Sequence, residues 1–262
     1  MPHLQYRLEG AVGHLVLDNA PQNRIGDQMV DELANAVEAI GKSAARAVIV
    51  RGAGEHFSFG GDITPWPGAS VRELRARFER YMDVFNAFER LPLPVIAAVH
   101  GKCFGGGLEL AVRTDVIIAA STATFGHPEQ SLGIVTLLGG IYRVAEKAGR
   151  AKASEWAMTS EPVPAAVMEH FGVVNRVVDE SALLAEAHDF AAKVSKGPTR
   201  AYAAHKALLR AWAQGGPAVA DGAMFDIVMP LFETRDVIDG LASAVSALKE
   251  GRARPVVNFS GQ

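Results

Sequence analysis

Two glutamates separated by twenty positions, Glu109 and Glu129, stand beside glycine-rich stretches of the chain. Glu109 follows the triplet Gly105–Gly107, and Glu129 follows Gly126 by three positions. Glycine lets a ligand approach main-chain N–H groups closely, because no Cβ is in the way. Two carboxylates beside such donors could supply an acid and a base to the molecule that the donors hold. The pairing therefore indicates acid–base chemistry.

The residues around the triplet predict a strand, a turn and a helix in succession. An apolar strand at 94–99 leads toward Gly105–Gly107, and a short helix from Gly106 to about Val112 leaves the turn. The first N–H groups of a helix are unpaired and lie at the positive end of its dipole. The Gly106 N–H can then point at a developing oxyanion. We expect the same dipole to lower the pKa of Glu109 and keep it ionised, as a base requires.

A second backbone donor is available upstream, where Gly60 and Gly61 interrupt an apolar stretch. The Gly61 N–H could form the other half of an oxyanion hole. Each feature alone has an ordinary structural explanation. The glycines could serve only tight turns, Glu109 could be a helix-dipole partner worth about 0.3–1 kcal/mol, and Glu129 could be a solvated loop carboxylate. The order in which these features follow one another, and not any single feature, indicates a catalytic site.

The pattern of elements that position these residues predicts a mixed α/β domain. The chain has 262 residues, of which 49% are hydrophobic, enough for one large domain or a domain with a helical appendage. Strands are expected at 12–17, 46–50, 94–99 and 116–120. Helices are expected at 27–40, 70–90, 182–194, 200–214 and 237–249, with one extended patch at 173–178. Strands separated by helices imply crossover connections and a mostly parallel sheet.

Composition narrows the class of protein. The net charge is −3, and no run of five like charges occurs, which argues against a nucleic-acid partner. The single cysteine, Cys103, cannot form an intrachain disulfide and fits a reducing compartment. The sequence shows neither a signal peptide nor an uncharged apolar stretch of about 18 residues, so we expect a cytoplasmic protein without a membrane partner. No cluster of His, Cys and Asp has metal-ligand spacing, so no metal is expected.

The order of motifs resembles the crotonase superfamily, also called the enoyl-CoA hydratase/isomerase family, over nearly the whole chain. The similar segments are Phe57–Ile63, Pro94–Gly101, Gly105–Leu110, the strand after Asp115, Phe125–Glu129 with Leu132-Gly133 and, more weakly, 172–178 and 234–240. The resemblance implies an α/β ClpP/crotonase-like fold, in which repeated ββα units form a mostly parallel sheet. It divides the chain into a core at 1–195 and a C-terminal helical trimerisation region at 196–262. The basic tail Arg252–Pro255 resembles a family segment that can approach CoA.

The resemblance also implies a reaction and a site. The N–H groups of Gly61 and Gly106 would polarise the thioester carbonyl of an acyl-CoA and hold its enolate. Glu109 would activate water for attack at Cβ, and Glu129 would deliver a proton to Cα, so the pair favours an enoyl-CoA hydratase. Substrate and CoA contacts are expected at Arg24, Gly60, Asp62, Ile63, Thr64, Leu132 and Leu137. Coenzyme A arrives as part of the substrate, no other cofactor is implied, and the family assembles as homotrimers or hexamers.

One departure from the family pattern concerns the acyl pocket. Where the family commonly shows Pro-Gly-x-Gly-Gly-Thr, this chain has Thr136-Leu137-Leu138-Gly139-Gly140-Ile141. Leu137 replaces a glycine, and its side chain would shorten or reshape the pocket. Double-bond isomerisation, hydrolysis or decarboxylation on the same scaffold therefore stays open. A noncatalytic binding protein with this fold is the alternative from another class. The acyl chain is not fixed by the sequence.

Overall fold

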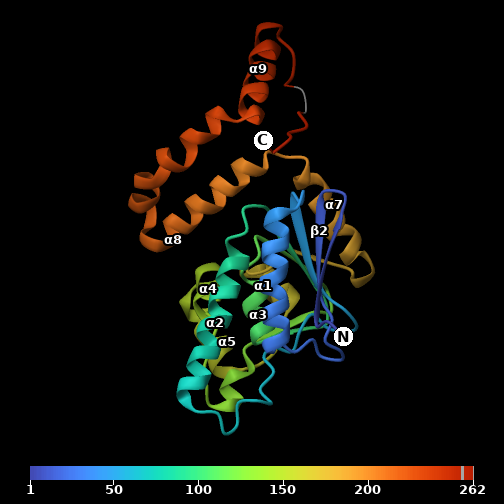
Figure 1. Ribbon diagram of the computed structural model, residues 1–262, viewed down its shortest axis with the longest axis vertical. Helices are drawn as coiled ribbons and strands as arrows, with labels where there is room; N and C mark the ends of the chain where they lie inside the picture. Colours follow the sequence, from blue (N-terminus) through green and yellow to red (C-terminus); the bar gives the residue numbers. More distant parts are fainter. Residues whose placement is uncertain (255–256, 262) are drawn as a thin grey trace.

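The computed structural model describes residues 1–254 and 257–261, so Pro255, the end of the basic tail, lies outside the described residues. The larger sheet has the strand order β1-β2-β3-β4-β6-β9 (Figure 1). Its strands are β1 (Leu4–Glu9), β2 (Val12–Leu17), β3 (Ala47–Gly52), β4 (Val95–Val99), β6 (Val116–Ala120) and β9 (Arg176–Val178). Only the β1–β2 pair is antiparallel among the pairs of this sheet, which confirms the expected mostly parallel arrangement.

A smaller sheet consists of β5 (Lys102–Phe104), β7 (Thr124–Gly126) and β8 (Val163–Pro164). The chain passes from a strand of the larger sheet to a strand of the smaller one and then to a helix. It does so through β4, β5 and α3 (Gly106–Ala111), and again through β6, β7 and the 3₁₀ turn η1 (Pro128–Leu132). This alternation is the ββα repeat. The sequence did not predict β5, β7 or β8, because two or three residues are too few to show periodicity.

Helices enclose the larger sheet. Figure 1 shows its strands between α1 (Asp27–Lys42) and α7 (Leu183–Ser195), and α7 packs across β3 and β4. Helix α2 (Val71–Glu89) packs on α1 and begins with a capping box between Ser70 and Glu73. Every residue of β4 is buried, as befits a central parallel strand. The remaining helices of the core are α4 (Gly140–Ala148), α5 (Arg150–Thr159), α6 (Ala165–His170) and the turn η2 (Glu180–Ala182).

The boundaries of several elements differ by a few residues from those that the sequence predicted. The strand expected at 46–50 lies at Ala47–Gly52. The extended patch at 173–178 is a strand only from Arg176 onward. The N–H groups of Val173 and Val174 both bond to the carbonyl of Met168, so these residues close the end of α6 instead of joining the sheet.

The C-terminal part extends away from the two sheets as a helical region (Figure 1). Helix α8 (Thr199–Val228) contains non-helical backbone at Gly215 and Gly216. The helix expected at 200–214 therefore ends at these glycines, and a second segment follows that the sequence did not predict. The turn η3 (Met229–Glu233) connects α8 to α9 (Arg235–Lys249). None of the helices in the described ranges is long and apolar enough to cross a membrane.

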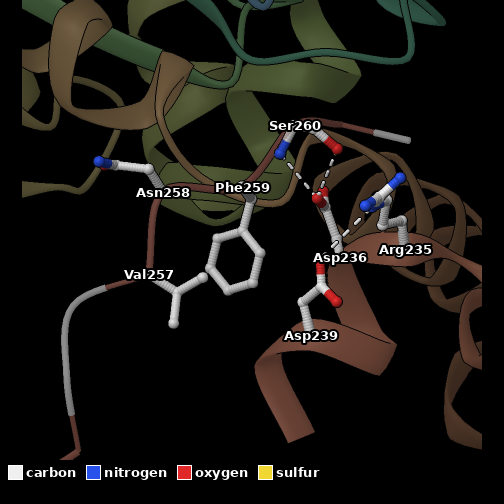
Figure 2. A pocket seen from close by; sticks show the side chains of 7 residues that line it. All are labelled: Arg235, Asp236, Asp239, Val257, Asn258, Phe259 and Ser260. Atoms are coloured by element: carbon white, nitrogen blue, oxygen red, sulfur yellow. Dashed lines mark hydrogen bonds and ion pairs between the residues drawn. The ribbon is translucent and has the colours of Figure 1, made fainter. Parts of the chain in front are cut away.

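The end of the chain returns to the base of this helical region. The Asp236 carboxylate accepts hydrogen bonds from the Ser260 N–H (2.7 Å) and the Ser260 hydroxyl (3.0 Å) (Figure 2). It also accepts one from the Gly261 N–H (2.9 Å). The Phe259 N–H donates to the carbonyl of Lys196, just before α8. A cavity of about 250 Å³ beside this tail contains none of the predicted site residues. The tail thus joins the start of α9 to the start of α8.

Candidate active site

Glu109 lies within α3, and its carboxylate is buried with only 3% exposure. Its Oε1 accepts the Leu138 N–H at 2.7 Å and the Gly140 N–H at 3.0 Å. Burial raises the pKa of Glu109, although these two bonds and the nearby Arg113 and Arg143 oppose the increase. The expectation that the helix dipole lowers this pKa is therefore wrong. Helix α3 has six residues, and the loss of hydration outweighs its field.

Glu129 lies in η1, directly after Pro128, and is partly buried. Its Oε2 is enclosed and has no hydrogen-bond partner among the described residues. Burial raises the pKa of Glu129 to about 7, and the charge of Glu109 adds to the increase. The alternative of a solvated loop carboxylate is therefore wrong. Because each carboxylate is within electrostatic range of the other, the two acids share one site.

The amides of Gly61 and Gly106 meet beside these acids. A Cβ added to Gly60 would lie 3.0 Å from the Gly106 nitrogen, and one added to Gly106 would lie 3.4 Å from the Gly61 nitrogen. The Ile25 N–H donates to the Gly60 carbonyl, and the Ile25 carbonyl accepts from the Asp62 N–H, which directs the Gly61 N–H away from Ile25. In the described chain, neither the Gly61 nor the Gly106 N–H has an acceptor. Two backbone amides without a protein acceptor thus lie close together at one cavity.

Gly60 makes this approach possible. Its φ of +98° belongs to the region that favours glycine. A Cβ there would also lie 2.8 Å from the carbonyl oxygen of Phe104. The Gly60 N–H binds the Ser58 hydroxyl at 3.0 Å, and that hydroxyl donates to the Asn23 carbonyl at 2.7 Å. The loop that carries the Gly61 amide is therefore held by buried hydrogen bonds.

A cavity of about 210 Å³ connects the acids and the amides. Of the predicted site residues, those that line it are Arg24, Gly61, Ile63, Gly106, Glu109, Glu129, Leu132 and Leu137. Gly60, Asp62 and Thr64 do not line it. The Asp62 carboxylate accepts the N–H and the hydroxyl of Thr64, so these two residues shape the loop. Arg24 places a cation at the cavity, and its guanidinium also donates to the Gly61 carbonyl at 3.3 Å.

Sequence reasoning missed the aromatic wall of this cavity, formed by Trp66, Phe78 and Tyr81. The Trp66 and Phe78 rings meet edge to face with centroids 5.2 Å apart. The Tyr81 hydroxyl donates to Asp27 at 3.0 Å. Phe78 and Tyr81 are three positions apart on α2, a spacing that places them on one helix face. That spacing is the feature of the sequence from which this part of the aromatic wall could have been predicted.

Comparison with known proteins agrees with this arrangement. A family model described as enoyl-CoA hydratase/isomerase matches residues 7–236. The "Probable enoyl-CoA hydratase" of Mycobacterium leprae is 34% identical over 251 residues, 92% of this chain and 93% of the relative. A "Probable enoyl-CoA hydratase" from Rhizobium meliloti is 34% identical over 249 residues, 92% of this chain and 94% of the relative.

A crystal structure of an enoyl-CoA hydratase subunit from Geobacillus kaustophilus superposes with a TM-score of 0.89 at 29% identity. The superposition covers 99% of this chain and 98% of that chain. The expected crotonase fold is thereby confirmed. Together, the family match, the relatives and the shared fold show that this chain belongs to the enoyl-CoA hydratase/isomerase family, the crotonase superfamily.

Proposed function

We propose that this protein adds water across the 2,3 double bond of an enoyl-CoA and produces a 3-hydroxyacyl-CoA. The observation that carries the proposal is the meeting of two free amides and two desolvated carboxylates in one cavity. The amides suit a carbonyl oxygen that gains charge, and the acids suit the carbons beside it. Relatives named enoyl-CoA hydratase support the same substrate class.

In the proposed reaction, the Gly61 and Gly106 N–H groups bind the thioester oxygen. Attack at Cβ moves the π electrons of the double bond toward that oxygen, and the resulting enolate places negative charge between the two amides. Loss of one such donor typically costs about 2.7–4 kcal/mol of transition-state stabilisation. In this proposal both donors are in place before the substrate binds, so little reorganisation is needed when the charge develops.

The two acids differ in a way that suits different roles. Glu109 accepts two N–H bonds, which favour its carboxylate form, so it takes a proton from the attacking water. Glu129 has a pKa of about 7 and is protonated in a large fraction of molecules at neutral pH. It donates that proton to Cα. The water oxygen bonds to Cβ, the enolate electrons form the new Cα–H bond, and the proton on Glu109 returns through solvent to Glu129.

The test is a hydration assay with short, medium and aromatic 2-enoyl-CoA thioesters. The reaction is monitored by the decrease in absorbance of the conjugated enoyl group. We expect Glu109→Gln and Glu129→Gln each to lower kcat by about 10²–10⁴-fold. Glu146→Gln is the matched control, because this exposed glutamate lies outside the cavity. The proposal fails if the wild-type protein hydrates none of these substrates. A product with a shifted double bond and no hydroxyl would instead assign an isomerase.

We propose that Arg24 contacts a phosphate of coenzyme A. Its guanidinium lies at the cavity and is held by the Gln22 side chain at 2.7 Å. Arginine offers paired donors that match phosphate oxygens. We expect Arg24→Ala to increase KM with little change in kcat, and a matched loss of affinity for free coenzyme A. Unchanged KM and affinity would contradict this role.

We also propose that the helical region at 196–262 joins three copies of the chain, or six as two trimers. Large apolar side chains are exposed there, including Leu209 (65%), Phe225 (70%) and Leu248 (66%). Such a surface favours contact with another protein chain. Light scattering after size-exclusion chromatography should give the mass of a trimer or hexamer. Phe225→Glu should reduce that mass, whereas Val71→Glu, at an exposed position on α2, should not. A monomeric wild-type protein would refute the proposal.

A further inference from the structure

An ion triad of Glu89, Arg113 and Arg143 lies near Glu109 and does not line the cavity. The Glu89 carboxylate binds Arg143 through two hydrogen bonds, at 2.8 Å to Nε and 2.6 Å to Nη2. The same carboxylate lies 3.7 Å from the Nε of Arg113, whose side chain is fully buried. Burial lowers the pKa of Arg113 to about 10, so it remains a cation at neutral pH. The reaction described above uses none of these three side chains.

Both arginines bind carbonyls of the loop that holds Glu109. Arg113 Nη1 donates to the Leu138 carbonyl at 2.7 Å, and Arg143 Nη1 donates to the Gly139 carbonyl at 3.3 Å. The Gly139 carbonyl and the Gly140 N–H belong to one trans peptide and point in opposite directions. Arg143 therefore holds the plane whose N–H bonds to Glu109.

The glycine at 139 fits this contact. Its φ is +85°, and a Cβ there would lie 2.6 Å from Nη1 of Arg143 and 2.1 Å from the Tyr142 hydroxyl. The space that a side chain would occupy is taken by the Tyr142 phenol and the Arg143 guanidinium. A Cβ at Gly140 would lie 2.8 Å from Glu109 Cγ and 3.5 Å from Glu109 Oε1, so the Glu109 side chain fills the space beside this glycine.

We propose that Arg143 and Arg113, joined by Glu89, are positioning residues for the loop that binds Glu109: Arg143 orients the Gly140 N–H toward the carboxylate, and Arg113 fixes the preceding Leu138–Gly139 peptide of the same loop. This inference rests on the proposed function for its catalytic meaning, but not for its geometry. The charged and titratable groups around Glu109 are Arg113, Arg143, Glu89, Glu129, Tyr142 and His127. The two cations favour the carboxylate form of Glu109, and Glu129 opposes it.

The experiment compares Arg143→Met with Lys206→Met in the full chain. Lys206 is the matched control, because its side chain is 12% exposed and pairs with Asp115, while that of Arg143 is 14% exposed and pairs with Glu89. The first readout is the Glu109 pKa from the carboxyl ¹³C shift, assigned with Glu109→Gln. The second is the pH profile of hydration. We expect Arg143→Met to raise that pKa by about one unit and to shift the acidic limb of the pH profile to higher pH. We also expect the variant to lower kcat more than it changes KM.

Lys206→Met should leave the Glu109 pKa and the acidic limb where they are in the wild type. If Arg143→Met does not fold, Arg143→Lys is tested in its place. A smaller increase in the Glu109 pKa and a reduced kcat are then expected, since one ammonium cannot bind both Glu89 and the Gly139 carbonyl. The inference is overturned if the Glu109 pKa in the tested variant equals that in the wild type. If the wild type hydrates nothing while the ¹³C titration shifts as expected, the proposed function fails and the positioning role stands.

Discussion

Replacing Glu129 by glutamine should stabilise the protein although it lowers turnover. The carboxyl is partly buried, its Oε2 has no hydrogen-bond partner in the described structure, and its pKa is raised from 4.5 to about 7. Because the folded-state pKa exceeds the unfolded value, ionisation is less favourable in the folded chain. Stability is therefore lost as the pH rises from about 4.5 to about 7. Glutamine has nearly the same shape and does not ionise.

The magnitude follows from the pKa change. Each pKa unit corresponds to about 1.4 kcal/mol, so a rise from 4.5 to about 7 penalises the ionised form by about 3 kcal/mol at most. Glu129 retains some access to solvent, which reduces this figure. We expect Glu129→Gln to be more stable than the wild type by about 1–3 kcal/mol at pH 8.5 and by little at pH 5. A gain in stability at the expense of activity is typical of a functional site.

Urea denaturation at both pH values, at one fixed protein concentration, measures the difference. Glu146→Gln serves as the control, since it removes an exposed carboxylate. The reasoning is refuted if Glu129→Gln destabilises the protein at pH 8.5, or if its effect is equal at the two pH values. Either result would mean that the native chain already satisfies the ionised carboxylate.

Three further outcomes are expected. The rate of hydration should fall about tenfold per pH unit above about pH 7, because Glu129 must be protonated to donate; a flat alkaline limb would contradict this. Gly60→Ala should lower kcat/KM by about 10²-fold, because the new Cβ would displace the Gly106 amide. The control is Gly68→Ala, which also has positive φ but whose Cβ would have no atom within 4 Å, so its kcat/KM should be nearly unchanged. Leu137→Ala should raise kcat/KM for a longer linear enoyl-CoA relative to crotonyl-CoA by about tenfold, and an unchanged ratio would show that this wall does not limit the acyl chain.

The sequence predicted the parts of this protein that repeat a pattern or carry a motif. The parallel strands and the convergence of Gly61, Gly106, Glu109 and Glu129 follow from periodicity and from motif order. The pKa of Glu109 was predicted in the wrong direction, because burial depends on a loop whose fold no local pattern encodes. That loop, at 136–140, departs from the family motif.

Other features lie beyond local sequence rules because they join distant segments. The triad that includes Arg113 brings together three helices or their ends, and an arginine in an apolar run gives no indication of its partner. The strands of the smaller sheet are too short to show alternation. The domain division at 195 stays a prediction.

One short loop carries two properties that are usually thought of as separate. The side chain of Leu137 forms a wall of the cavity, while the next residue donates the main-chain bond that holds Glu109. A mutation that remodels the wall therefore also perturbs the strength of the base. Divergence toward new acyl groups at this position is constrained by reactivity, and an engineer who changes selectivity here should measure the pH optimum of every variant.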